Sequence, residues 1–252
     1  MSGFATARSA QGETAWAFRH LLHFPRLGVY YSLIPKNACT STFLALAEAE
    51  GGLADWFRSG TRIHNLHDHY RAYRQPHEFR EGDRRLILVR EPLRRLASAL
   101  TDKIVQTAPE KRPQLDFFCR AIGKSAPELT LRDILRICDS YPAPFLEPHF
   151  APQSDFVFFD DYTDVIFADM HLPALELGGR RIDLRVMNKG APAPGYEIED
   201  MTLGAIWARR REGALPSRDS LIRMIDAEAA PGGNIRNDIA FWSSLSATGA
   251  GA

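Results

Sequence analysis

An α/β fold, with a parallel β-sheet flanked by helices, is the fold class that the sequence predicts. Residues 29–34 form an apolar run of the kind that makes a buried strand, and the segment 84–100 contains another at 86–89; each run is followed by a short turn and a helix-forming run. The same alternation continues with strand-like runs at 156–159, 165–167 and 182–186, helical periodicity over 108–140, and two helical pieces over 217–245. Strands that alternate with helices favour a parallel sheet covered on both sides.

The first turn, residues 35–41, has the features of an anion cradle. Pro35 ends the first strand, and Thr40 and Ser41 precede the helix-forming run 43–50. Free N–H groups and the positive dipole end of a helix therefore meet the ammonium of Lys36. The turn predicts a site for phosphate or sulfate.

This turn differs from the common nucleotide-binding loop. The pattern G-x-x-x-x-G-K-[ST] would require glycines at Tyr30 and Pro35 and a hydroxyl at Asn37. Ordinary ATP or GTP binding is therefore disfavoured.

The second strand-to-helix turn predicts a second phosphate site. Pro92 suits the first turn of the helix, and Arg90 at the strand end is expected to lie near Ser98, at the edge of the apolar stripe. Arginine offers a bidentate grip on phosphate. Arg94 and Arg95 lie outside the stripe and are expected on the solvated face.

Three segments resemble the membrane-type carbohydrate sulfotransferases. They are P-K-x-A-C-T-S at residues 35–41, V-R-[DE]-P-x-x-R-x-x-S-A at residues 89–99, and a stretch similar to H-W-x-P-Q at residues 149–153, where Phe150 replaces the usual Trp. The three follow one another in the family's order. The resemblance implies a P-loop-like sulfotransferase fold and the donor 3′-phosphoadenosine 5′-phosphosulfate (PAPS).

The resemblance also implies roles for particular residues. The phosphosulfate end of PAPS would be held by the first turn: Pro35, Lys36, Asn37, Ala38, Cys39, Thr40 and Ser41. Arg90 and Ser98 would hold the 3′-phosphate, and Lys36 would also stabilise charge during transfer. Cys39 is interpreted as a packing residue of this turn, because a phosphatase-type loop would need an arginine at Ala45.

The general base is expected among the histidines of residues 51–83. Sulfuryl transfer to a hydroxyl needs a base near the attacking oxygen, and histidine suits neutral pH. Four histidines lie here, His64, His67, His69 and His77. Related sulfotransferases place their catalytic histidine in this interval, so His67 and His64 are the leading candidates. His149 is a further candidate, and a structural role is the alternative for each.

The sequence leaves two other functions open. The cluster of His64, His67 and His69 with Asp68 could hold zinc in a hydrolase, although its spacing does not match the run H-x-H-x-D-H. A non-catalytic anion- or glycan-binding domain is the other alternative, but Lys36, Arg90 and Ser98 are all intact.

Composition favours one soluble enzyme domain. The chain has 252 residues, 45% of them hydrophobic, which suffices for one large core. We expect a single sulfotransferase domain over 1–252, with a lead-in at 1–27, a His-rich insert at 51–83 and a frayed tail at 246–252. The 31 basic and 31 acidic residues give no argument for a nucleic-acid partner.

The remaining expectations concern location and substrates. Three widely spaced cysteines indicate a reducing compartment, and neither an apolar run of membrane-spanning length nor a secretory signal is recognised. We therefore expect a cytoplasmic, bacterial-type enzyme that transfers sulfuryl groups in line from PAPS to a hydroxyl of a carbohydrate or glycolipid. It would release 3′-phosphoadenosine 5′-phosphate (PAP) and need no metal.

Overall fold

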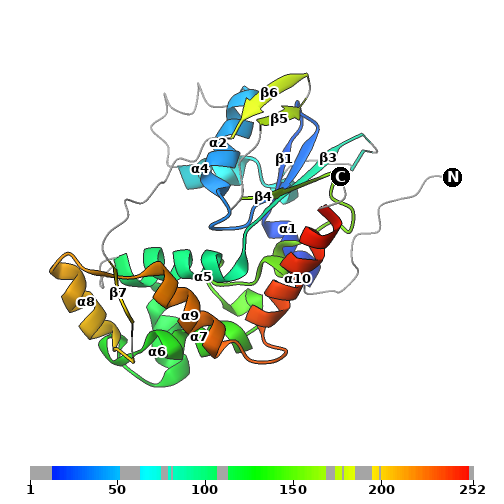
Figure 1. The fold of residues 1–252 in the computed structure, drawn as a ribbon. Helices are drawn as coiled ribbons and strands as arrows, with labels where there is room; N and C mark the ends of the chain where they lie inside the picture. Colours follow the sequence, from blue (N-terminus) through cyan, green and yellow to red (C-terminus); the bar gives the residue numbers. More distant parts are fainter. Residues whose placement is uncertain are drawn as a thin grey trace. The chain divides into compact units, whose positions relative to one another are not determined.

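The computed structural model describes residues 13–51, 63–74, 79–80, 82–106, 113–168, 174–177, 179–184, 195–198 and 200–249. The chain divides into two compact units (Figure 1). Unit 1 comprises Met1–Arg90, Gln153–Lys189 and Thr248–Ala252, and unit 2 comprises Glu91–Pro152 and Gly190–Ala247.

Unit 1 is built on a mixed four-stranded sheet in the order β1-β2-β3-β4. Its strands are β1 (Leu21–Phe24), β2 (Val29–Ser32), β3 (Arg84–Val89) and β4 (Asp164–Phe167). β2, β3 and β4 are parallel, whereas β1 forms an antiparallel hairpin with β2. The predicted α/β class is therefore confirmed, and β1 lies inside the segment that the sequence predicts as a lead-in.

The outer edge of β1 is itself paired. The N–H of His23 donates to the carbonyl oxygen of Tyr70 at 2.8 Å, and Leu22 forms an antiparallel bridge with Arg71. These partners follow α4 (Ile63–His69) and precede the 3₁₀ helix η1 (Ala72–Arg74). Part of the segment at 51–83 thus extends the sheet.

Apolar side chains cover both faces of this sheet, as the two-residue period of a strand requires. Val29 and Tyr31 point into a cluster with Phe43 of α2 (Cys39–Glu50) and with residues of α4 and the hairpin β5 (Ala174–Leu177) and β6 (Arg180–Asp183). Tyr30 points the other way, into a cluster that includes Ala17 of α1 (Glu13–Arg19). Helices therefore flank the sheet on both sides (Figure 1).

The prediction of a strand at residues 156–159 is wrong. The 3₁₀ helix η6 (Gln153–Phe156) is followed by irregular backbone. Phe158 and Phe159 are both buried, and the Phe158 N–H donates to the hydroxyl of Tyr162 at 3.0 Å. Consecutive apolar side chains can pack on one core from a loop, whereas a strand would direct them to opposite faces.

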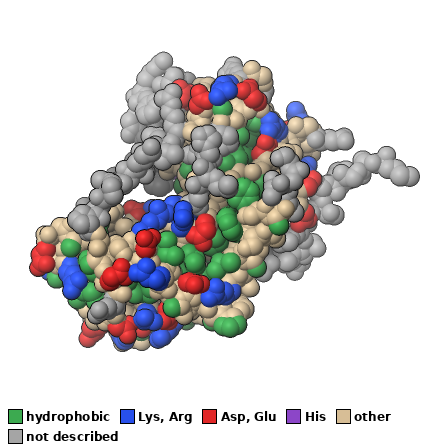
Figure 2. All heavy atoms as spheres, in the orientation of Figure 1, with side chains coloured by type: hydrophobic (Ala, Val, Ile, Leu, Met, Phe, Trp, Pro, Cys, Tyr) green, Lys and Arg blue, Asp and Glu red, His purple; other side chains and the backbone are tan. Residues whose placement is uncertain are grey.

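Unit 2 is mainly helical. Its elements are α5 (Pro92–Leu100), the π-helix η2 (Thr101–Gln106), α6 (Pro113–Ile122), η4 (Ala126–Glu128), α7 (Leu131–Ser140), η5 (Ala143–Phe145), β7 (Gly195–Tyr196), α8 (Leu203–Arg211), β8 (Leu215–Pro216), α9 (Arg218–Glu228) and α10 (Asn234–Gly249), whose last residues belong to unit 1. Thr130 caps α7, because it exchanges hydrogen bonds with Asp133 in a capping box. On the face in Figure 2, acidic and basic side chains intermingle over these helices.

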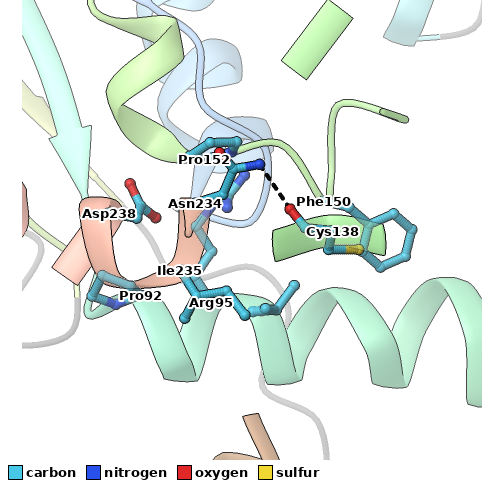
Figure 3. Close-up of a pocket in the computed structure, with 9 residues that line it drawn as sticks. Pro92, Arg95, Cys138, Phe150, Pro152, Asn234, Ile235 and Asp238 are labelled. Atoms are coloured by element: carbon cyan, nitrogen blue, oxygen red, sulfur yellow. Dashed lines mark hydrogen bonds between the residues drawn. The ribbon is translucent and has the colours of Figure 1, made fainter. Parts of the chain in front are cut away.

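Buried Asp139 joins the end of α7 to the connection between α9 and α10 and to the first turn of α10. Its carboxylate accepts hydrogen bonds from the N–H groups of Ala230 and Ile235, both at 2.8 Å. Asn234 donates from Nδ2 to the carbonyls of Cys138 and Tyr141, and the first of these bonds is drawn in Figure 3. This connection separates the two C-terminal helical pieces that the sequence predicts.

The close approach at Gly233 gives a stability prediction. A Cβ on Gly233 would lie 2.3 Å from Oδ2 of Asp139, so Gly233→Ala must displace the carboxylate from its two N–H donors. We expect the free energy of unfolding to fall by about 1–3 kcal/mol. Chemical denaturation measures this loss, with Gly82→Ala as the control because nothing lies within 4 Å of its Cβ position. Equal stability of the two variants would contradict the assigned role.

Candidate active site

The anion loop, which we define as residues 35–41, connects β2 to α2 in a constrained backbone conformation. Lys36 has a φ of 71° and Ala38 a φ of 54°, so two residues with side chains occupy the left-handed region. Each such residue costs roughly 1–2 kcal/mol relative to ordinary backbone. Strain of this kind persists where surrounding contacts impose it, and it is common at ligand sites.

The start of α2 is available to an anion. Its N-cap is Ala38, and no side chain caps the helix there. A left-handed residue just before a helix directs successive N–H groups into a concave cluster suited to anions. The helix begins at Cys39, slightly earlier than the sequence indicates, because backbone geometry rather than a Thr or Ser cap sets its start.

The predicted donor-binding side chains divide by exposure. Lys36, Ala38, Cys39 and Thr40 are partly exposed, whereas Pro35, Asn37 and Ser41 are buried. Any contact from Asn37 to a bound donor would therefore come from its backbone. The roles of all these residues remain predictions.

A buried amide network joins the anion loop to the end of β3. Asn37 donates from Nδ2 to the Leu88 carbonyl at 2.8 Å and to Oε1 of Gln153 at 2.5 Å. Gln153 in turn accepts from the Arg90 N–H at 2.9 Å and donates to the Arg90 carbonyl at 2.8 Å. The sequence places Gln153 in the third family-like segment but does not show what it contacts.

Arg90 reaches the anion loop directly. Its Nη1 donates to the Lys36 carbonyl at 3.2 Å, within unit 1. Ser98 is a partly buried residue of α5 in unit 2. The pairing of Arg90 with Ser98 remains a prediction.

The expectation that Arg95 lies on a solvated face is wrong. Its side chain is only 2% exposed, whereas Arg94 is exposed and lies 4.0 Å from Glu91. Arg95 lines a pocket in unit 2, together with Phe150, Pro152 and Asp238 (Figure 3). Its Nη2 lies 3.5 Å from the Pro148 carbonyl, so Arg95 connects α5 to residues 148–152. The apolar stripe alone underestimates how much of α5 is covered.

His67 lies in the core on the side of α2. Its ring is 8% exposed and packs edge-to-face on Phe43, with ring centroids 4.2 Å apart. His69, two residues on, is exposed. His64 belongs to α4, but its side chain and the whole of His77 lie outside the described residues.

His149 forms a carboxylate–imidazole pair in unit 2. Its Nδ1 lies 2.5 Å from Oε1 of Glu147, and its side chain is 26% exposed. A carboxylate on one ring nitrogen fixes the orientation of an imidazole, as in catalytic triads. The spacing of Glu147 and His149 is the only sequence signal for this pair.

His20 is poorly suited to act as a base. Burial, reinforced by the positive charges of Arg71 and Arg19, lowers the pKa of His20 to about 3.

Among the residues whose placement the structure describes, no group of three or more His, Cys, Asp or Glu side chains could hold a metal ion. None of the helices in the described ranges has the length and apolar character needed to cross a bilayer.

These features define an α/β fold with a candidate anion site at the carboxyl end of strand β2, where the strand meets a helix. The model of the sulfotransferase family matches residues 19–166, which is more than half of the 252 residues. The chain belongs to the sulfotransferase family and is a transferase of sulfuryl groups. No curated protein and no solved structure matches the chain.

Proposed function

We propose that this sulfotransferase takes the sulfuryl group from PAPS and transfers it to a hydroxyl of a carbohydrate or glycolipid. The observation that carries the proposal is the anion loop, in which Lys36 stands between parallel strand β2 and the uncapped start of α2. The family match covers this loop, Arg90 and the segment that contains Gln153.

The donor fits the chemistry of these residues. PAPS carries a phosphosulfate at one end of its ribose and a phosphate at the other. We assign the phosphosulfate to Lys36 and the backbone N–H groups at the start of α2, where a helix dipole favours anions. We assign the 3′-phosphate to Arg90 and Ser98.

The proposed step is an in-line displacement at sulfur. The acceptor oxygen forms a bond to sulfur while the bond from sulfur to the phosphate oxygen of the donor breaks, and PAP leaves. Lys36 and the helix N–H groups stabilise the charge that develops on the leaving phosphate. A histidine, His67 or His64, takes the proton from the acceptor. Positive groups of the protein would fill the role that magnesium has in phosphoryl transfer.

The wider setting is proposed on the same basis. We propose a cytoplasmic enzyme in which residues 1–252 act as a single sulfotransferase domain. The alternatives of a zinc hydrolase and a non-catalytic glycan-binding domain are kept as outcomes of the tests below.

An acceptor screen tests the proposed function. Purified protein is incubated with radiolabelled PAPS and a panel of polysaccharides, glycolipids and small hydroxyl compounds, and transferred label is counted. We expect label on a carbohydrate-type acceptor together with release of PAP. Binding of glycans without any transfer would favour the non-catalytic alternative.

The 3′-phosphate assignment gives a prediction about nucleotide selectivity. Arg90→Ala and Ser98→Ala should weaken PAP binding by roughly tenfold or more, the typical effect of losing a hydrogen bond to a charged group. Binding of adenosine 5′-phosphate, which lacks the 3′ group, should change much less. Calorimetry with both nucleotides measures the difference, and Arg94→Ala is the matched control because that side chain is 53% exposed. Equal losses for both nucleotides would refute the assignment.

A further inference from the structure

We infer that Gln153 and Asn37 are positioning residues that hold the anion loop in its binding conformation and couple it to Arg90. This inference rests on the proposed function of that loop. Both side chains are fully buried, at 0% exposure, so neither meets a bound donor through its amide group. They act through the backbone: Asn37 directly follows Lys36 in the chain, and Gln153 bonds the N–H and the carbonyl of Arg90.

The backbone of Arg90 dictates how both amides are oriented. Its N–H donates to Gln153 and its carbonyl accepts from Gln153, so the Gln153 oxygen and nitrogen cannot be exchanged. The Gln153 oxygen and the Leu88 carbonyl then both face Asn37, which must present its NH₂ group to them. The network therefore has a single arrangement.

This arrangement leaves one polar atom of Asn37 without a hydrogen bond in the part of the chain that the structure describes. Its Oδ1 is buried and has no hydrogen-bond partner among the described residues. An unsatisfied buried acceptor is unfavourable, and the opposite amide orientation would set Oδ1 against two other oxygens. The position is thus held by the two donor contacts of its Nδ2.

The two residues with positive φ lie on either side of Asn37 in the chain. Asn37 is flanked by Lys36 and Ala38, both with positive φ, and the guanidinium of Arg90 holds the carbonyl of Lys36 at 3.2 Å. The contacts of the Asn37 side chain and of the Lys36 carbonyl therefore restrict the backbone between the two residues with positive φ. This explains how residues with a Cβ remain in a backbone region that favours glycine.

The chemistry also explains why position 153 carries glutamine. Only a side chain that has both a donor and an acceptor can pair with the N–H and the carbonyl of one backbone residue. A glutamate in its ionised form offers no donor, and a methionine of similar length offers neither strong group. The Pro-Gln segment thereby acquires a role in setting the loop that precedes α2.

The test compares Gln153→Met and Asn37→Ala with Tyr162→Phe. Tyr162 is a matched control, because its buried hydroxyl also bonds side chain and backbone in unit 1, to Ser32 at 2.6 Å and Phe158 at 3.0 Å, but not to the anion loop. Two readouts are used: hydrogen–deuterium exchange of the amides of residues 36–42, and calorimetric affinity for PAP. The midpoint of thermal unfolding, measured for each variant, shows how far changes in exchange and affinity follow a general loss of stability.

We expect Gln153→Met and Asn37→Ala each to speed exchange in the anion loop at least tenfold and to weaken PAP binding at least tenfold. Tyr162→Phe should lower stability without either effect. The double variant should lose little more affinity than the worse single variant, since the two side chains bond each other. Should Gln153→Met not fold, Asn37→Ala carries the test alone.

Several results would overturn the inference. Unchanged loop exchange in a folded variant would do so, as would losses that simply follow stability in all three variants, or failure of both network variants to fold. If the wild-type protein binds no PAP, the proposed function fails, but the exchange measurement still decides the positioning role.

Discussion

Replacing Lys36 with alanine is expected to lower the rate of sulfuryl transfer on the order of a hundredfold or more, if its ammonium stabilises the leaving phosphate. Steady-state kinetics with PAPS and the best acceptor measure the effect. The loss should appear chiefly in kcat, because the leaving phosphate carries more charge in the transition state, where its bond to sulfur is breaking, than in bound PAPS.

The design of this variant separates charge from backbone strain. Alanine already occupies the left-handed region at position 38, with a φ of 54°, so alanine at position 36 keeps a Cβ without relaxing the loop as glycine would. Lys124→Ala is the control, since it removes a 44% exposed lysine that pairs with Asp133 at 2.9 Å. Near-normal turnover in folded Lys36→Ala protein would exclude the proposed role.

Loss of the general base should abolish transfer while leaving the donor bound. If His67, or failing that His64, takes the acceptor proton, its alanine variant should bind PAP within roughly threefold of wild type. Wild-type activity should rise with pH through an acid limb, because protonated imidazole cannot accept the proton. Residual activity of the variant should lack that limb.

The burial of His67 calls for a structural control in this experiment. Its ring packs on Phe43, so His67→Ala removes core contacts as well as a base. Comparison with His67→Gln, which keeps more volume, and thermal unfolding of both variants separate the two effects. Full activity in the variants of both His67 and His64 would refute their role, and His149, paired with Glu147, would be tested next. Loss of stoichiometric zinc along with activity would instead support the metallohydrolase.

Local patterns in the sequence predict the parts of the fold that depend on neighbouring residues. The strand and helix at residues 84–100 are found as predicted, since an apolar run, a Pro at the first helical position and a regular stripe all agree there. β1 was missed because four residues carry too little periodicity to separate a strand from a lead-in. Residues 156–159 have strand-like composition, but tertiary packing holds them at the end of η6 and in the irregular backbone that follows it.

The candidate site shows the same division. The anion loop follows from residue types in sequence order, whereas its positive φ angles at Lys36 and Ala38 do not, since neither is glycine. The contacts of Gln153 with Arg90 and Asn37 join residues more than sixty positions apart, which no local pattern records. Burial of Arg95 likewise depends on a segment that follows it by about fifty residues.

The pairing of β1 with residues 70 and 71 has a consequence for solubility. A strand at the edge of a sheet normally presents open N–H and C=O groups, which can recruit a strand from another molecule. Here the His23 N–H is already bonded to Tyr70 within the same chain. The segment that follows α4 therefore covers this edge of the sheet. Its loss would expose Leu21–Phe24, an entirely buried strand, to pairing with strands of other molecules and so to aggregation.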